Sequence, residues 1–180
     1  MEYSKIDKLN VNPSLLGFGC MRFPKKEDGT IDEVEAERML DYAIESGVTY
    51  IDTAYPYHDG ESEPFIGRVL KKYKREDFYL ATKLPMFKID SLEQAKEIFE
   101  EQILDVDYVD FYLLHALNKD TWKKVIDLNI IPYCEELKKQ GRIKNFGFSF
   151  HDDYEVFEEI INYRDWDFCQ IQLNYIDTDI

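Results

Sequence analysis

The stretch DEVEAERMLDYAIESGVTYIDT, residues 32 to 53, contains the unit that decides the fold. Asp32 is suited to be an N-cap, and apolar residues then recur with helical spacing as far as Ile44. Gly47 is a natural stop for that helix, and a short β-rich run follows it directly. A helix that leads straight into a buried strand is half of a βαβ unit, so this stretch predicts parallel strands.

The same unit recurs along the chain at intervals of ~25–35 residues, which is typical of consecutive βαβ units. The apolar runs that predict strands are Ser14–Cys20, Thr49–Asp52, Phe78–Thr82, Tyr108–Leu114, Phe146–Ser149 and Phe168–Leu173. Further helices are expected over Ser62–Tyr73, from a capping box at Ser91 and Gln94 through Ile103, over Trp122–Lys139 with a kink or new start at Pro132, and after Asp152 or Asp153.

Two α/β architectures compete, an open doubly wound sheet and a closed (β/α)8 TIM barrel. The run Gly17-Phe18-Gly19-Cys20 lacks the third glycine of a dinucleotide-binding turn, which favours the barrel. A full barrel needs eight units and about 250 residues, whereas six strand signals occur before Asp179-Ile180. We therefore expect residues 1–180 to form one barrel-type domain that is truncated before closure, with its C-terminal strands missing. The alternative is that the open edges pair with another copy or another chain.

The composition excludes several classes of protein. The formal net charge is −15, from 22 Lys and Arg against 37 Asp and Glu, and such a surface repels nucleic acid and anionic membranes. The first ten residues contain no apolar targeting segment, and no apolar run approaches membrane-spanning length. Cys20, Cys134 and Cys169 lie far apart, which predicts no disulfide framework and no metal site. We expect a protein of the reducing cytoplasm.

Polar residues follow consecutive predicted strands at the end where barrel enzymes carry their catalytic groups. Asp52 and Tyr57 follow the second run, Lys83 the third and His115 the fourth. A buried ammonium needs a carboxylate partner, and an ammonium beside a phenol favours the phenolate. The phenol then becomes a better proton donor to a carbonyl oxygen, which a neutral histidine can orient. Two further candidates, Ser149 and Gln170, lie at the ends of the fifth and sixth runs.

Each of these residues also has a plain structural interpretation. Asp52 could cap a turn, Lys83 could extend to the rim, and His115 could be a satisfied core histidine. Tyr57 could line a pocket, and Tyr55 is a rival for its role. His58 and His151 are expected at the surface or rim. What favours chemistry is that all four residue types lie at the same end of consecutive strands.

Four motifs carry a resemblance to a known family. The segment AIESGVTYIDTA, residues 43 to 54, is followed by Tyr57, Gly60, Ser62-Glu63 and Gly67. This order resembles the D-T-A-x-x-Y-x-x-G-x-S-E-x-x-x-G signature of the aldo-keto reductase family, in which the tyrosine lies five residues after the aspartate. The spacing therefore selects Tyr57 over Tyr55. Three later motifs also resemble the family's, and they are Ala81-Thr82-Lys83, the run 110–115 that ends in His115, and the run 141–149 that ends in Ser149.

The resemblance implies an NAD(P)H-dependent oxidoreductase that reduces an aldehyde or ketone to an alcohol. Tyr57 would be the general acid, Asp52 and Lys83 would tune it, and His115 would orient the small-molecule carbonyl substrate. NADPH is the typical cofactor and NADH is also open, with Ser149 and Gln170 holding the carboxamide of the nicotinamide. In the family the last two units bind much of the dinucleotide, so the 180-residue chain alone is expected to bind it poorly and to be poorly active.

One motif departs from the family pattern. Many members carry an asparagine after the serine, whereas here Phe150 and then His151 follow Ser149. The F-H-D run is similar to a bacterial branch whose members add a ferredoxin-like domain at the far C-terminus. A 4Fe-4S cluster would belong to such a domain, because these 180 residues have no cluster-binding cysteine pattern.

Two other functions remain open from the residues. Some members of the family are cofactor-bound regulatory subunits of membrane channels and keep the same four residues. A Schiff-base lyase would use Lys83 as a nucleophile, but the lysine would then have to be unpaired. Asp52 and the spacing of Tyr57 argue against the lyase, and we expect the reductase.

Overall fold

A computed structural model describes residues 1–102 and 106–176. Every predicted apolar run overlaps a strand and every predicted helical segment overlaps a helix, but β3, β4 and β5 extend beyond the predicted runs. The strands are β1 (Gly17–Gly19), β2 (Tyr50–Asp52), β3 (Tyr79–Leu84), β4 (Val109–Leu117), β5 (Ile143–Phe150) and β6 (Phe168–Gln170). The helices are α1 (Glu33–Glu45), α2 (Ser62–Leu70), α3 (Leu92–Gln102), α4 (Lys119–Asp127), α5 (Ile130–Lys139) and α6 (Tyr154–Tyr163).

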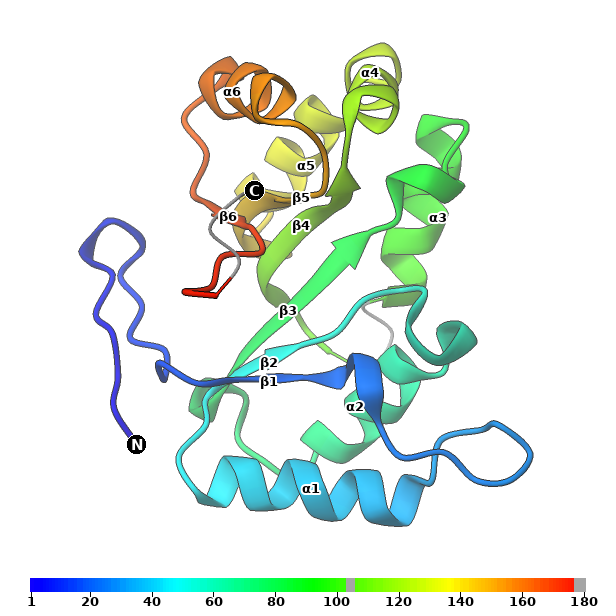
Figure 1. Cartoon of the computed structure of the whole chain (residues 1–180), viewed down its shortest axis with the longest axis vertical. Coiled ribbons are helices and arrows are strands. Elements are labelled where there is room, and N and C mark those ends of the chain that lie inside the picture. The colour runs from blue at the N-terminus through cyan, green and yellow to red at the C-terminus, as the bar shows by residue number, and fades with distance from the viewer. Residues whose placement is uncertain (103–105, 177–180) are drawn as a thin grey trace.

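The six strands form one sheet in the order β1-β2-β3-β4-β5-β6, and every neighbouring pair is parallel. A doubly wound sheet would reverse its strand order part-way, so the sequential order confirms the barrel architecture. The sheet curls, and the helices lie outside it along the bottom, right and top of the view in Figure 1. The fold is therefore an incomplete (β/α)8 barrel whose concave side is open.

The predicted helix boundaries follow local chemistry. The side chain of Asp32 caps α1 by accepting a hydrogen bond from the backbone N–H of Glu35. Gly47, with a φ of 93°, provides the left-handed position just beyond the end of that helix. The predicted long helix around Pro132 is two helices, because Asn129 turns the chain at a φ of 55° and α5 starts afresh at Ile130.

Some boundaries differ from the predictions. The strand β6 stops at Gln170, and Leu173 is 80% exposed instead of continuing the strand. The helix α2 ends at Leu70, three residues before Tyr73. Ile103, predicted as part of the inner face of α3, lies outside the described residues.

The capping predictions also need correction. Ser91 accepts from the N–H of Gln94 as expected, but Gln94 accepts in return from the N–H of Asp90 and not of Ser91. The helix α6 starts after Asp153, whose side chain makes no cap bond. Asp152 instead accepts from the backbone N–H groups of Asp153 and Lys119.

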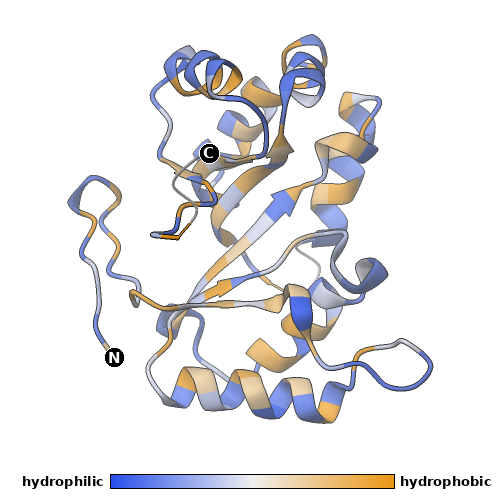
Figure 2. Ribbon diagram, in the orientation of Figure 1, coloured by the Kyte–Doolittle hydropathy of each residue, from blue (hydrophilic) through white to orange (hydrophobic). Residues whose placement is uncertain are grey.

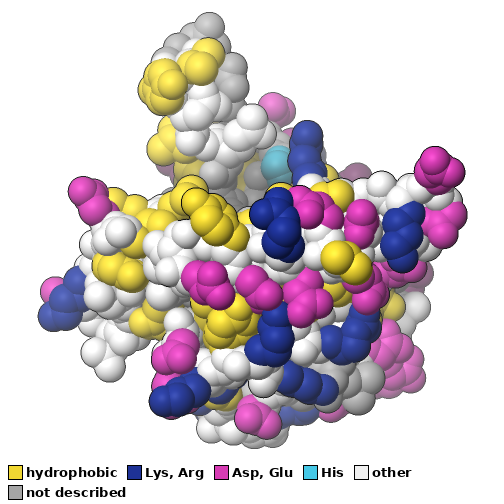
Figure 3. All heavy atoms as spheres, turned by 90° about the horizontal axis from the view of Figure 1, so that it is seen from below, with side chains coloured by type: hydrophobic (Ala, Val, Ile, Leu, Met, Phe, Trp, Pro, Cys, Tyr) yellow, Lys and Arg dark blue, Asp and Glu magenta, His cyan; other side chains and the backbone are white. Residues whose placement is uncertain are grey.

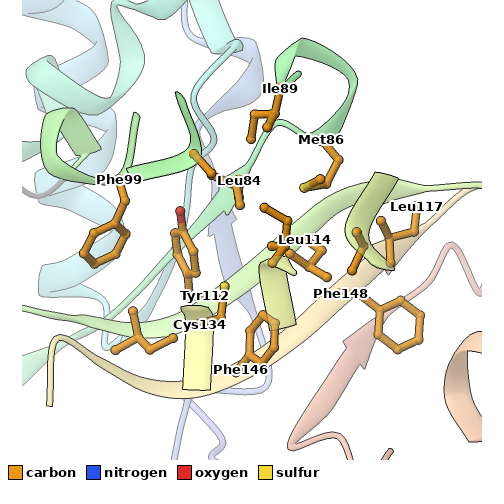
Figure 4. Close-up of a cluster of buried hydrophobic side chains, with 14 of the residues drawn as sticks. Leu84, Met86, Ile89, Phe99, Tyr112, Leu114, Leu117, Cys134, Phe146 and Phe148 are labelled. Carbon is orange, nitrogen blue, oxygen red and sulfur yellow. The ribbon is translucent and has the colours of Figure 1, made fainter. Parts of the chain in front are cut away.

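The hydrophobic core lies between the sheet and the helices. Apolar colours concentrate on the strands and the inner faces of the helices in Figure 2. Figure 4 shows the larger cluster, in which Phe99, Tyr112 and Phe146 fill the space between the strands and α3 or α5. A second cluster joins β2 to α1 and α2. These two layers hold the strand ends, and hence the residues at them, in fixed positions.

Charges of both signs are interspersed on the surface seen from the side of α1 in Figure 3. Ion pairs join α1 to α2 and to the residues just after it, with Arg68 2.6 Å from Glu33 and Lys72 2.7 Å from Glu37. In the described part of the chain, no helix combines the length and apolar character needed to cross a bilayer.

Candidate active site

Lys83 is the centre of the polar cluster at the strand ends. Its Nζ lies 2.6 Å from Oδ1 of Asp52 and donates to the backbone carbonyl of Thr53 at 2.9 Å. It also donates to the hydroxyl of Tyr57 at 3.3 Å. Lys83 is 2% exposed, so the carboxylate offsets an ammonium that would otherwise be buried alone. The lysine does not extend to the rim.

A tight turn after β2 brings Tyr57 to Lys83. The backbone N–H of Tyr57 donates to the carbonyl of Ala54 at 3.0 Å. His58 and Asp59 then continue with positive φ angles of 52° and 56°. Tyr55 points elsewhere, because its hydroxyl donates to Glu101 at 3.0 Å. The geometry therefore agrees with the five-residue spacing, which selects Tyr57 over Tyr55.

His115 lies beside Tyr57 on the irregular end of β4. The two rings pack edge to face, with centroids 6.0 Å apart. Ala116 has a φ of 51°, and the pairing of β4 with β5 shifts register between Leu114 and Leu117. Burial, helped by the nearby charge of Lys83, lowers the pKa of His115 to about 4, so the imidazole is neutral at pH 7. Its Nδ1 is buried and makes no hydrogen bond within the described residues, unlike that of a satisfied core histidine.

The two candidate cofactor residues also reach this cluster. The hydroxyl oxygen of Ser149 accepts from the backbone N–H of Ala116 at 2.8 Å. Nε2 of Gln170 lies 3.4 Å from Oδ2 of Asp52. All six predicted site residues are therefore at one end of the sheet, and five of them line a hollow of about 190 Å³. The hollow is lined by Tyr57, Lys83, His115, Ser149, His151, Gln170, Ile171 and Gln172.

Where the serine-asparagine pattern is broken, the side chain at position 150 lies away from the hollow. Side chains alternate along β5, so Ser149 and Phe150 face opposite sides of the sheet. Phe150 packs on Phe157 of α6, with ring centroids 5.3 Å apart, and cannot reach the hollow. His151, which we expected only at the surface or rim, is exposed and lines the hollow.

Three features of the site were missed by sequence reasoning. The carbonyl of Thr53 binds Lys83, Phe87 packs 5.7 Å from the ring of His115, and His151 joins the lining. His58, also expected at the surface or rim, is instead half-buried and accepts a hydrogen bond from the N–H of Phe23 at 3.2 Å. No sequence motif predicts such contacts, because they form only when segments far apart in the sequence pack together.

A sequence model described as "Aldo/keto reductase family" matches residues 15–179. The chain belongs to the aldo-keto reductase family. That match includes every candidate residue, and it confirms the resemblance inferred from the four motifs.

Similar proteins agree with this family assignment. The chain is 31% identical to "Probable aldo-keto reductase 1" of Glycine max over 76% of its length. It is 32% identical to "Uncharacterized oxidoreductase YqkF" of Bacillus subtilis over 83%. The solved aldo-keto reductase AKR11C1 from Bacillus halodurans, a holo form, superimposes with a TM-score of 0.78 at 31% identity and covers 96% of the chain.

The aldo-keto reductase chain spans about half the length of the curated relatives it matches, 41% of the Glycine max protein and 49% of YqkF. It covers 58% of the Bacillus halodurans structure. The matched part contains the sheet β1–β6 and the hollow at its strand ends.

Proposed function

We propose that this chain carries the proton-donating group of an NAD(P)H-dependent carbonyl reductase, which converts an aldehyde or ketone to an alcohol. One observation supports this most strongly. A buried ammonium, Lys83, lies between the carboxylate of Asp52 and the hydroxyl of Tyr57, beside a hollow that admits small molecules.

Tyr57 is the general acid in this proposal. Because Lys83 already donates to the phenol oxygen, the phenol's own proton is free to be given to a carbonyl oxygen in the hollow. The ammonium then stabilises the phenolate that remains, and Asp52 keeps the ammonium in place. The hydride that the carbonyl carbon needs would come from a reduced nicotinamide bound beside Ser149 and Gln170.

His115 orients the substrate. Its pKa of about 4 keeps the ring neutral at pH 7, so one ring nitrogen carries a hydrogen and can donate to the same carbonyl oxygen. A neutral donor does not compete with Tyr57 for the role of acid. This division of roles follows from the burial of His115 beside the charge of Lys83.

The residues present suit the carboxamide of a nicotinamide. Ser149 accepts from Ala116, which leaves its hydroxyl hydrogen available to an amide oxygen. Gln170 also lines the hollow and offers an amide group there. NADPH is the cofactor we propose, with NADH as the second choice. We place the protein in a reducing cytoplasm, since Cys20, Cys134 and Cys169 are all free thiols.

Replacing the tyrosine tests the proposal. Tyr57→Phe removes only the phenolic hydroxyl, and we expect NADPH-dependent reduction of simple aldehydes to fall by about 100-fold or more. Tyr55→Phe is the matched control, because Tyr55 bonds Glu101 and does not line the hollow. The assay uses the full-length product of the gene. Undiminished turnover in Tyr57→Phe would refute the proposal, and dinucleotide binding without any turnover in the wild type would favour a regulatory subunit.

A further inference from the structure

A second polar cluster lies behind β3, on the side of the sheet that faces the helices. It consists of Glu63 from α2, Thr82 from β3, Gln102 from α3 and Tyr112 from β4. Thr82 is 2% exposed, Gln102 7% and Tyr112 0%. Polar groups in such a layer are costly unless they are hydrogen-bonded, so their mutual bonds determine where they can lie.

The bonds of this cluster lead to the backbone of Lys83. Oε1 of Glu63 accepts from the hydroxyl of Thr82 and, at 2.8 Å, from Nε2 of Gln102. The hydroxyl of Tyr112 donates to Oε1 of Gln102 at 2.7 Å. Nε2 of Gln102 also donates to the carbonyl of Lys83 at 3.0 Å. Glu63 thus fixes the side-chain amide of Gln102, which in turn holds the backbone carbonyl of Lys83.

The first turn of α2 contacts both β3 and the residue that follows β2. Ser62, next to Glu63, lies with its hydroxyl 2.9 Å from that of Thr53. The carbonyl of Thr53 accepts from Nζ of Lys83, also at 2.9 Å. Since Thr82 and Lys83 are consecutive in a strand, their side chains point to opposite faces. The cluster therefore acts on Lys83 from behind and does not line the hollow.

We propose that Glu63 is a positioning residue. Through Thr82 and Gln102 it holds the end of β3 so that the Lys83 ammonium stays in place. The inference rests on the proposed function in one respect, namely that this ammonium serves Tyr57.

The positioning role does not depend on the charge of Glu63. Burial raises the pKa of its carboxyl to about 7, although the hydrogen bonds from Thr82 and Gln102 oppose that rise. Oε1 can accept hydrogen bonds in either protonation state. An amide at this position keeps such an oxygen, whereas alanine removes it.

Two variants separate these possibilities in the full-length product of the gene. We expect Glu63→Ala to lower kcat by about 10- to 100-fold with little change in KM, because a small displacement of a site group affects the reacting step. We expect Glu63→Gln to stay within about threefold of the wild type, since it keeps the acceptor. Glu159→Ala is the matched control, as Glu159 is a helix residue that accepts from buried Trp122 Nε1 at 2.9 Å.

A second measurement on the 180-residue chain needs no turnover. In NMR spectra, the ¹H and ¹³C chemical shifts of Lys83 Cε and of the Tyr57 ring should change in Glu63→Ala and stay at their wild-type values in Glu63→Gln. If these shifts respond but the wild type reduces no carbonyl, the proposed function fails and the positioning role stands. Thr82→Val removes the donor to Glu63 with little change of shape, and it should act like Glu63→Ala if that variant does not fold.

Three results would overturn the proposal. One is a folded Glu63→Ala or Thr82→Val with the Lys83 shifts and kcat of the wild type. Another is a Glu63→Gln variant whose kcat is as low as that of Glu63→Ala. The third is a loss of kcat in Glu63→Ala without any movement of the Lys83 shifts, which would mean a general loss of stability.

Discussion

At the scale of single residues, the pair of Asp52 and Lys83 dominates the energetics of the site. The side chains are 14% and 3% exposed, so removing one partner leaves the other charge buried and uncompensated. We expect Asp52→Asn to lower the free energy of unfolding by about 3–5 kcal/mol. Denaturant titration of the 180-residue chain measures this.

The matched control for that prediction is an exposed pair. Lys123 and Asp127 are 75% and 55% exposed, and Asp127→Asn should cost less than about 1 kcal/mol. Equal losses in Asp52→Asn and Asp127→Asn would contradict the account of a buried ion pair.

Glu63 makes stability depend on pH. Its pKa is raised from 4.5 in the unfolded chain to about 7 in the folded protein. Between these values the folded state binds more protons, so this contribution to stability is full below pH 4.5 and is lost as pH rises through 7. The glutamine of Glu63→Gln carries no charge, so the stability of this variant lacks that dependence on pH. Relative to the wild type, its free energy of unfolding should therefore rise by as much as about 3 kcal/mol between pH 4.5 and a pH above 7. Thermal or denaturant unfolding at pH 4.5 and pH 8 checks this, and a constant difference between the two proteins would contradict it.

The individual site residues differ in how far sequence could predict them. Asp52, Lys83 and His115 follow from a simple rule, because the carboxyl ends of parallel strands meet at one edge. Tyr57 needed the family spacing, since Tyr55 is an equal candidate by position alone. The carbonyl of Thr53 and the amide of Gln102 could not be predicted, because their contacts arise only when distant segments pack together.

At the scale of secondary-structure elements, the pairing of β5 with β6 depends on one glycine. A Cβ on Gly147 would lie 2.3 Å from the carbonyl oxygen of Phe168, too close for β6 to remain in place. We expect Gly147→Ala to cost about 1–3 kcal/mol of unfolding free energy and to displace Gln170. Gly19→Ala is the control, because a Cβ there meets no atom within 4 Å, and denaturant titration compares the two. Equal stability of the two variants would contradict this.

Elements with a buried face were predicted more accurately than those at an edge. The helix α1 carries a strong apolar period and starts directly after its predicted cap, Asp32, whereas the buried strand β3 extends two residues beyond its predicted end at Thr82. The strand β6 was predicted to reach Leu173 because that segment is apolar, yet it ends at Gln170. An apolar segment becomes a strand only when a neighbour pairs with it, and sequence alone does not reveal the neighbour.

At the scale of the whole molecule, the concave side of the sheet is open between β1 and β6. Gly17, Phe18, Phe168 and Cys169 line a hollow there of about 440 Å³. A dinucleotide held only by Ser149 and Gln170 would remain largely exposed to water. We therefore expect the 180-residue chain alone to bind NADPH weakly in a fluorescence titration, and tight saturable binding would contradict this.

The most direct test of the central claim follows the atoms of the reaction. The full-length gene product is incubated with NADPH deuterated at the transferable hydrogen and with a simple aldehyde. We predict an alcohol with one deuterium on the former carbonyl carbon, formed in an amount equal to the cofactor oxidised, and a loss of that product in Tyr57→Phe. No deuterated alcohol from the wild type, or an equal yield from Tyr57→Phe, would contradict the account.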